Sequence, residues 1–412
     1  MNILVVNAGS SSLKYQLIDM TSESLLAKGL CERIGIEGSN IEQKANGRVY
    51  QKTLPLKNHT EAFGALVGAL TDPEYGALKD LSLIGAVGHR VVHGAEAFTG
   101  SVVIDGAVMK ALRDNIPLAP LHNPANIMGI EACRSVMPGV PMVAVFDTAF
   151  HQTMPRRAYL YGLPYEYYEK YRIRRYGFHG TSHRYVASRA AALLGKPIER
   201  LKLISCHMGN GSSFAAVDGG RSVDTTMGLT PLEGLIMGTR SGDLDPAVIE
   251  MLAQTEGISL KDAIGVLNKK SGLLGLSGGL SSDWRDIRAG LQAGDDAAAR
   301  AAEVFAYRAK KYIGAYIAAM NGCDAILFTA GIGENDGCAR EMILKDMDYL
   351  GIELDPELNK ARGEALISAS GSRVKVFVVP TNEELAIARD TLALTGTARA
   401  RFNTPAIERS FA

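Results

Sequence analysis

The chain has 412 residues, which is more than one hydrophobic core usually supports, so two lobes are expected. Hydrophobic residues make up 47% of the chain and charged residues 21%, the balance of an ordinary globular protein rather than a disordered one. Lys plus Arg and Asp plus Glu are equal at 44 each, which leaves no basic excess for binding a nucleic acid or an anionic membrane.

The start of the chain predicts neither a secretory signal nor a membrane anchor. MNILVVNAGSSSLK has no basic residues before its apolar stretch, and no apolar run elsewhere approaches a membrane-spanning length. The five cysteines are widely spaced and indicate no zinc site or disulfide framework. We therefore expect a cytoplasmic protein with neither a membrane nor a nucleic-acid partner.

Residues 2–19 predict a β-hairpin. Leu13, Tyr15 and Leu17 share one side of its second strand, and Gly9-Ser10-Ser11-Ser12 reads as the tight turn. The segment 203–220 has the same design, with an apolar strand, a Gly-Asn-Gly-Ser turn and an apolar return strand. This parallel predicts one such hairpin near the start of each lobe.

Capping signals predict the first helices in chain order. Asn123-Pro124 is expected to begin a helix that stops at Pro138-Gly139, with Asn123 as its N-cap. Ser182 is the expected N-cap of a helix that ends near Gly195, and Asp245-Pro246 begins another. The segment 223–245 before it is long, rich in Gly and Thr and without period, which is typical of a functional loop.

The last third of the chain alternates helices and strands. Residues 295–320 predict a long amphipathic helix, followed by a buried strand at 325–328 and a glycine loop at 330–335. A second apolar strand at 374–379 leads into a last helix that starts at 380–382. Strands that alternate with helices predict an α/β protein.

The two glycine-rich turns are candidate phosphate sites. Gly and Ser in a turn expose N–H groups and hydroxyls that can converge on an anion, with Lys14 able to reach a phosphate and Asn7 able to hold a metal-bound water. Either turn alone is more often an ordinary hairpin, but both together with GIGEN at 331–335 favour a polyphosphate site. No Walker P-loop occurs, and no GxGxxG follows a strand, so a Rossmann enzyme is disfavoured.

HRVVHG (89–94) and FHGTSH (178–183) each place two histidines four residues apart, a spacing that can bind zinc on a helix. The valines favour extended structure in the first segment, and neither segment contains the Glu of the metalloprotease motif. Hydrogen-bonded structural roles are the better interpretation of His93 and His183.

Charged side chains mark candidate contacts to an anionic substrate. Arg90 and Arg240 lie in glycine-containing, non-helical segments, where a guanidinium can hold a carboxylate or phosphoryl group, although a surface ion pair is the common alternative. Asp147 follows the apolar strand 142–146, a place for active-site carboxylates and equally for a helix N-cap. Glu383 opens the last helix, where a carboxylate is favourable whatever the function.

The order of these motifs resembles that of the acetate kinase family over essentially the whole chain. The matching segments are VVNAGSSSLK (5–14), HRVVHG, GFHGTSH (177–183), HMGNGSS (207–213), GTRSGDLDP (238–246), GIGEN and PTNEE (380–384). The resemblance implies a two-lobed, actin-like ATPase fold with a duplicated ribonuclease H-like βββαβαβα core in each lobe. It also implies a first lobe of residues 1–148 completed by 383–412, and a second lobe of residues 149–382 with the nucleotide site and a homodimer interface.

The resemblance further implies a role for each matching residue. Arg90 would bind the carboxylate of acetate, His179 and Arg240 would stabilise the transferred phosphoryl group, and Asp147 is the candidate acid or base. The methyl pocket would comprise Val92, Leu121, Phe178 and Pro231, and Mg²⁺, or Mn²⁺ in its place, would be held by Asn7 and Glu383. ATP would contact Ser10, Ser12, Lys14, His207, Gly209, Asn210, Gly211, Asp283, Trp284, Arg285, Gly331, Ile332, Gly333, Glu334 and Asn335, with Trp284 acting through its backbone alone.

The expected reaction is reversible, magnesium-dependent phosphoryl transfer from ATP to acetate by direct in-line displacement rather than through a phosphorylated Glu383. A carboxylic acid with a pKa of about 4 is already ionised at neutral pH, so Asp147 is expected to orient a magnesium-bound water or Arg90 rather than to move a proton. Val92 favours acetate, with propionate a slower substrate. The alternatives are a propionate or other short-chain carboxylate kinase, a pyrophosphate-using relative, and a non-catalytic ATP-binding protein of the superfamily. The presence of Arg90, His179 and Arg240 argues against the last.

Overall fold

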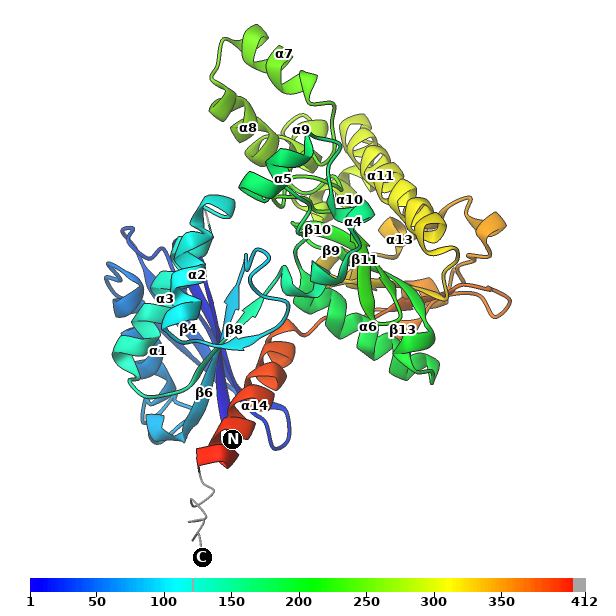
Figure 1. Ribbon diagram of the computed structural model, residues 1–412. Coiled ribbons are helices and arrows are strands. Elements are labelled where there is room, and N and C mark those ends of the chain that lie inside the picture. The colour runs from blue at the N-terminus through cyan, green and yellow to red at the C-terminus, as the bar shows by residue number, and fades with distance from the viewer. Residues whose placement is uncertain (121, 403–412) are drawn as a thin grey trace, which may run out of the picture. The chain divides into compact units, whose positions relative to one another are not determined.

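The computed structural model describes residues 1–120 and 122–402, with side chains described to residue 396 (Figure 1). Leu121 and the end of the expected first-lobe segment, residues 403–412, lie outside the described residues. The chain forms two compact units, one of residues 1–149 with the segment from 382 onward, and one of residues 150–381.

The first unit is built on a mixed sheet with the strand order β5-β4-β3-β2-β1-β6-β8-β7. Strands β1 to β5 run antiparallel in succession, whereas β1, β6 and β8 are parallel. The strands are β1 (Asn2–Ala8), β2 (Ser12–Asp19), β3 (Ser24–Glu32), β4 (Asn40–Ala45), β5 (Arg48–Thr53), β6 (Ile84–Val91), β7 (Val102–Val103) and β8 (Met142–Phe146). The predicted N-terminal hairpin is confirmed as β1 and β2, with Leu13, Tyr15 and Leu17 buried.

Helices cover both faces of this sheet because side chains alternate along β1. Leu4 and Val6 belong to the core that packs against α1 and α3, while Val5 and Asn7 line the cavity beside α14. Figure 1 shows α1 and α3 on one side of the sheet and α14 on the other. A side chain on Gly88 in β6 would lie 2.5 Å from Oγ1 of Thr391, so the glycine allows α14 to approach the sheet. The helices are α1 (His59–Leu70), α2 (Gly106–Asp114), α3 (Asn123–Val136) and α14 (Glu383–Phe402), with short 3-10 turns η1 (Leu81–Leu83) and η2 (Ile116–Leu118).

The second unit repeats the strand pattern of the first. Its sheet has the order β11-β10-β9-β12-β14-β13, in which β9 to β11 are antiparallel and β9, β12 and β14 are parallel. The strands are β9 (Lys202–Met208), β10 (Ser212–Asp218), β11 (Arg221–Thr225), β12 (Ala325–Thr329), β13 (Ala365–Leu366) and β14 (Lys375–Val378). The second predicted hairpin is therefore confirmed as β9 and β10.

Alternation along β9 again divides the helices between the two sheet faces. Leu203 packs with α6, whereas Ile204 belongs to the larger core under α11. The α-helices are α4 (Arg156–Tyr159), α5 (Tyr165–Tyr171), α6 (Gly180–Leu194), α7 (Ala247–Glu256), α8 (Leu260–Lys269), α9 (Gly272–Leu276), α10 (Trp284–Ala293), α11 (Asp296–Met320), α12 (Ala330–Asn335) and α13 (Gly337–Leu344). The 3-10 turns are η3 (Ala149–Thr153), which begins at the last residue of the first unit, η4 (Ile198–Arg200), η5 (Asp348–Leu350) and η6 (Leu358–Lys360).

Three local predictions are corrected by the structure. Asn123 lies inside α3 rather than capping it, because its side-chain amide donates to the carbonyl oxygen of His93. Ser182 lies inside α6, and His179 in a left-handed conformation takes the N-cap position. The expected loop at 330–335 is the short helix α12, which starts at Ala330 with a φ of 63°.

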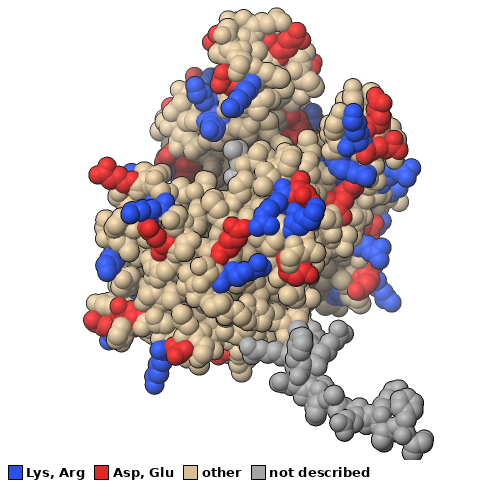
Figure 2. Space-filling view, turned by 60° about the vertical axis from the view of Figure 1, so that its left-hand side comes forward, with Lys and Arg blue, Asp and Glu red and all other residues tan. Residues whose placement is uncertain are grey.

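The charged surface agrees with the balanced composition. Figure 2 shows acidic and basic side chains interspersed on the face in view. Within the described part of the chain, no helix is both long and apolar enough to cross a membrane. The cytoplasmic location and the expected lack of a nucleic-acid partner stay predictions.

Candidate active site

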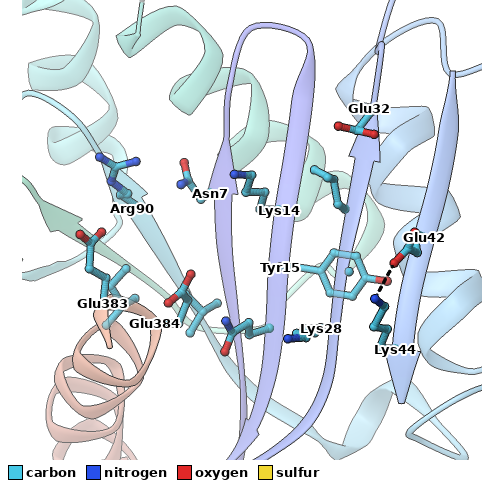
Figure 3. A pocket seen from close by; sticks show the side chains of 15 residues that line it. Asn7, Lys14, Tyr15, Lys28, Glu32, Glu42, Lys44, Arg90, Glu383 and Glu384 are labelled. Atoms are coloured by element: carbon cyan, nitrogen blue, oxygen red, sulfur yellow. Dashed lines mark ion pairs between the residues drawn. The ribbon is translucent and has the colours of Figure 1, made fainter. Parts of the chain in front are cut away.

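The first unit contains a cavity of about 290 Å³ that extends from β6 and the start of α14 across β1 and β2 to β3 and β4. Asn7 and Lys14 are paired across β1 and β2, and Arg90 is on β6, which neighbours β1. Figure 3 shows these three side chains beside one another, with the carboxylates of Glu383 and Glu384 facing them. The cavity thus gathers residues that are widely separated in the sequence and combines cationic, amide and carboxylate groups.

Arg90 is held by a bidentate ion pair with Asp147. Nε of Arg90 donates to Oδ1 of Asp147 over 2.9 Å, and Nη2 donates to Oδ2 over 2.6 Å. The Asp147 side chain is 2% exposed, whereas that of Arg90 is 24% exposed. Asp147 therefore fixes the guanidinium plane, while Arg90 keeps an accessible side for a ligand.

The surroundings of Glu383 disfavour the ionised form of its carboxyl group. Burial, together with the nearby charges of Asp147 and Glu384, raises its pKa to about 7, while Arg90 acts in the opposite direction. Two carboxylates in one cavity are stabilised by a cation, and the amide of Asn7 adds a neutral oxygen donor.

Oxygen donors of this kind fit Mg²⁺, which retains water and substrate ligands. The described residues contain no cluster of three His, Cys, Asp or Glu side chains able to hold a metal by themselves. The donor set therefore suits a magnesium ion only if water or a bound ligand completes its coordination.

The remaining first-unit candidates lie close to the ends of the strands. Ser10 and Ser12 form the β1–β2 turn, where the N–H of Gly9 donates to the carbonyl oxygen of Ser12 over 2.8 Å. Val92 is buried, and its N–H donates to Oδ1 of Asn126 over 3.0 Å. Leu121 lies outside the described residues.

In the second unit, Arg240 and His179 converge on the β9–β10 turn. A side-chain carbon placed on Gly211 would lie 3.5 Å from Nη1 of Arg240 and 3.7 Å from Nε2 of His179. Arg240 donates to the carbonyl oxygen of Pro231 over 3.3 Å, and among the described residues no carboxylate pairs with it. Burial lowers the pKa of this guanidinium. A desolvated cation above a glycine turn is a site that favours an anion.

A serine and a second histidine contact the ring of His179 and fix its orientation. Nδ1 of His179 bonds Oγ of Ser213 over 2.9 Å, and the ring stacks on His207 with centroids 4.2 Å apart. His183 is buried between Ser205 and Ser213, and burial holds its pKa well below the usual value, so it is a neutral structural histidine as predicted. Phe178, the residue before His179, is buried at 2% exposure.

A cavity of about 750 Å³ lies beside the same turn of the second unit. Its lining includes eight of the predicted ATP-binding residues, which come from the β9–β10 turn, the start of α10 and helix α12: Gly209, Asn210, Asp283, Trp284, Arg285, Gly331, Ile332 and Asn335. The sequence reasoning missed four further lining residues, Ser282, Arg288, Asp336 and Arg362. Helix periodicity places Arg288 one turn after Trp284 and could have indicated it, whereas Arg362 follows η6, which carries no motif.

Gly333 and Glu334 have structural positions. Neither residue is among those that line the cavity. Oε1 of Glu334 instead accepts hydrogen bonds from the N–H of Ala330 over 2.7 Å and from the N–H of Thr381 over 3.1 Å. Glu334 therefore caps its own helix instead of facing the cavity.

Comparison with known proteins places the chain in one family. Residues 2–389 match the acetokinase family. The acetate kinase of Acetivibrio thermocellus is 60% identical over 396 residues, which cover 96% of this chain and 99% of that protein. The crystal structure of Porphyromonas gingivalis acetate kinase has a TM-score of 0.92 at 46% identity, and that of a propionate kinase from Francisella tularensis has 0.89 at 41%, each covering 95% of this chain and 99% of the other. These matches confirm the expected two-lobed α/β fold, and the chain belongs to the acetokinase family.

Proposed function

We propose that this chain catalyses reversible, magnesium-dependent transfer of a phosphoryl group from ATP to acetate, giving acetyl phosphate and ADP. The observation that carries the proposal is the position of Arg240, a half-buried cation with no carboxylate partner among the described residues, beside His179 on the Gly211 turn. Phosphoryl transfer needs alignment and charge stabilisation more than covalent help from the protein, and these groups supply both.

Arg90 is the proposed acetate site. Its exposed side can form a charge-assisted bond with the acetate carboxylate, while Asp147 holds its other side. Acetate is ionised at neutral pH, so the nucleophile needs no general base. The two-point bond to Arg90 supports an orienting role for Asp147 rather than proton transfer.

His179 and Arg240 are proposed to bind the oxygens of the transferred phosphoryl group. The second-unit turn at Gly209, Asn210 and Gly211 would bind the adjacent phosphates, and the cavity between α10 and α12 would bind adenosine. On the first unit, Ser10, Ser12 and Lys14 would contribute to phosphate binding. Asn7 and Glu383 would hold Mg²⁺, with Glu384 as an additional candidate ligand. Bound Mg²⁺ would neutralise phosphate charge as it does in kinases generally.

Acetate is the proposed substrate over longer acids, with Val92, Leu121, Phe178 and Pro231 as the proposed methyl pocket. The 41% identity to a propionate kinase keeps propionate as a second candidate. One methylene in an apolar pocket is worth only about 1–3 kcal/mol, so propionate should react more slowly rather than not at all. Comparing kcat/KM for acetate, propionate and butyrate distinguishes the two.

We also propose that the second unit carries a homodimer interface. Helix α7 has no buried residue, and its Val248 and Met251 side chains are 45% and 70% exposed. Apolar groups at this exposure on neighbouring helical turns are typical of an interaction surface.

The purified full-length chain tests the proposed activity directly. With ATP, Mg²⁺, acetate and hydroxylamine, acetyl phosphate is trapped as acetohydroxamate, and the signal should require both acetate and ATP. Arg240→Ala should lower the rate by at least about 100-fold. An active wild-type chain that releases phosphate from ATP without forming hydroxamate would contradict the proposal.

A further inference from the structure

Arg240 lies on a loop, residues 234–243, whose two ends are bonded to each other. The N–H of Gly234 donates to Oδ1 of Asp243 over 2.8 Å, and the N–H of Asp243 donates to the carbonyl oxygen of Gly234 over 3.0 Å. At Gly242, where φ is 67°, a side-chain carbon would lie 2.4 Å from that same carbonyl oxygen. The loop is therefore a tight ring closed by one carboxylate.

The carboxylate that closes the ring is held by helix α11. The hydroxyl of Tyr312 donates to Oδ2 of Asp243 over 2.5 Å, and Nη1 of Arg308 lies 3.3 Å from the same oxygen. Arg308 also donates to the carbonyl oxygen of Asp243 over 3.1 Å. Because the buried face of α11 belongs to the main core of the second unit, the loop closure is tied to a rigid element.

The far side of the loop is held by backbone bonds. The N–H of Leu273 donates to the carbonyl oxygen of Met237 over 2.9 Å, and that of Ser271 donates to the carbonyl oxygen of Thr239 over 3.0 Å. The Arg240 side chain itself has weak anchors, namely the carbonyl oxygen of Pro231 at 3.3 Å and the sulfur of Met237 at 3.6 Å. The direction of its guanidinium therefore depends on the path of the loop.

We propose that Asp243 and Tyr312 are positioning residues, which form a brace that holds the Arg240 loop in its reactive geometry. The inference rests on the proposed role of Arg240 in phosphoryl transfer. Tyr312 does not line either cavity described above, and its hydroxyl is engaged by Asp243, so it acts through the loop rather than on a substrate.

The test is a substitution that removes one hydroxyl. Tyr312→Phe in the full-length enzyme should lower kcat about 10- to 100-fold, because small displacements of a catalytic group are costly, while the KM for ATP changes by less than about twofold. Tyr307→Phe is the matched control, because Tyr307 is on the same helix and 65% exposed. That variant should retain wild-type kinetics.

A double-mutant cycle separates positioning from general structural weakening. In an Arg240→Ala background, Tyr312→Phe should leave the residual rate unchanged, because the group that it positions is gone. Equal losses in both backgrounds, or a wild-type kcat for folded Tyr312→Phe, would overturn the inference. If that variant does not fold, Asp243→Asn replaces it in the same cycle. A wild-type chain without acetohydroxamate formation would instead refute the proposed function.

Discussion

At the scale of single residues, the sequence identified the candidate side chains but not their partners. Arg90 and Asp147 are 57 positions apart and meet because β6 and β8 are paired in parallel, with Val91 opposite Phe146. Local sequence made Asp147 an active-site carboxylate or a helix cap with equal justification. The strand register, which is a tertiary property, makes it the partner of Arg90.

The Arg90–Asp147 pair predicts how Asp147→Asn will behave. An amide can accept only one of the two guanidinium bonds, so Arg90 loses its fixed orientation and the KM for acetate should rise about tenfold or more. The affinity for Mg²⁺ should not fall at pH 8, where Glu383 is ionised with or without the charge of Asp147, because Asp147 is bonded to Arg90. Initial rates across acetate and Mg²⁺ concentrations measure both. A weaker Mg²⁺ affinity with an unchanged KM for acetate would contradict this role and indicate that Asp147 belongs to the metal site.

The raised pKa of Glu383 predicts a pH dependence for magnesium binding. With a pKa of about 7, the carboxyl group of Glu383 is mostly protonated below neutral pH and must lose that proton before it can bind Mg²⁺. The apparent affinity for Mg²⁺ should therefore fall as the pH decreases from 7 to 6. Isothermal titration with ADP present measures this slope. Glu383→Gln should bind Mg²⁺ more weakly and with a smaller slope, the remainder coming from the terminal phosphate of ADP, whose second pKa is about 6. Equal slopes in the wild type and the variant would contradict the assignment.

The same residue predicts the stability of the ligand-free protein. A folded pKa of about 7 against an ordinary value of 4.5 means that the folded state binds this proton more tightly than the unfolded chain does. Its contribution to the free energy of unfolding is therefore present below pH 4.5 and is lost as the pH rises to 7, by up to about 3 kcal/mol. Glu383→Gln should be the more stable protein at pH 8 in thermal unfolding, and an equal or lower Tm would contradict this.

At the scale of elements, cap and period signals located α3, α6, α11, α14 and the two hairpins, but they misplaced the caps of α3 and α6, missed α1 and gave α12 as a loop. Helix α12 was expected as a loop because its glycines disfavour a helix. Tertiary bonds override that preference: Glu334 caps its start, and the buried guanidinium of Arg340 donates to the carbonyl oxygen of Gly333 over 2.8 Å. Such long-range anchors leave no local pattern in the sequence.

Arg340 predicts an effect on nucleotide binding without direct contact. It also donates to the carbonyl oxygens of Asn359 and Ala361, so it ties α12 to the segment that carries Arg362 on the proposed nucleotide cavity of the second unit. Arg340→Met should raise the dissociation constant for ADP about tenfold, because it leaves buried carbonyl groups unpaired and the cavity wall loose. The KM for acetate should stay within about twofold.

The single tryptophan provides the measurement. Trp284 is buried at the wall of this cavity, so its fluorescence should change when ADP binds, and titration of that signal measures the affinity. Ile343→Ala is the control, because Ile343 is on α13 with Arg340 and its truncation empties part of the core without removing the hydrogen bonds of Arg340. If Ile343→Ala weakens ADP binding as much as Arg340→Met does, both losses come from general destabilisation and the inference about Arg340 is wrong.

At the scale of the whole molecule, the two units share a strand order that the sequence indicated only at its hairpins. The orders β3-β2-β1-β6-β8 and β11-β10-β9-β12-β14 are equivalent, whereas the first sheet adds β4 and β5. These additions were missed because β5 is an edge strand with a largely exposed, polar sequence. The first α-helix after β8, α4, belongs to the second unit, and α14, which follows β14, belongs to the first, which strand patterns alone cannot specify.

The exposed apolar face of α7 predicts the assembly state. Val248 and Met251 are three residues apart and so lie on one side of the helix, and Leu260 at the start of α8 is 65% exposed. If these side chains form the homodimer interface, Met251→Glu would bury a charge without a partner and raise the dimer dissociation constant at least about 100-fold. Sedimentation velocity should then show a dimer for the wild type and a monomer for the variant at micromolar concentration.

Tyr349→Glu, which also replaces an exposed apolar side chain of the second unit, is the control and should stay dimeric. A Met251→Glu protein that remains a dimer would show that α7 does not form the interface.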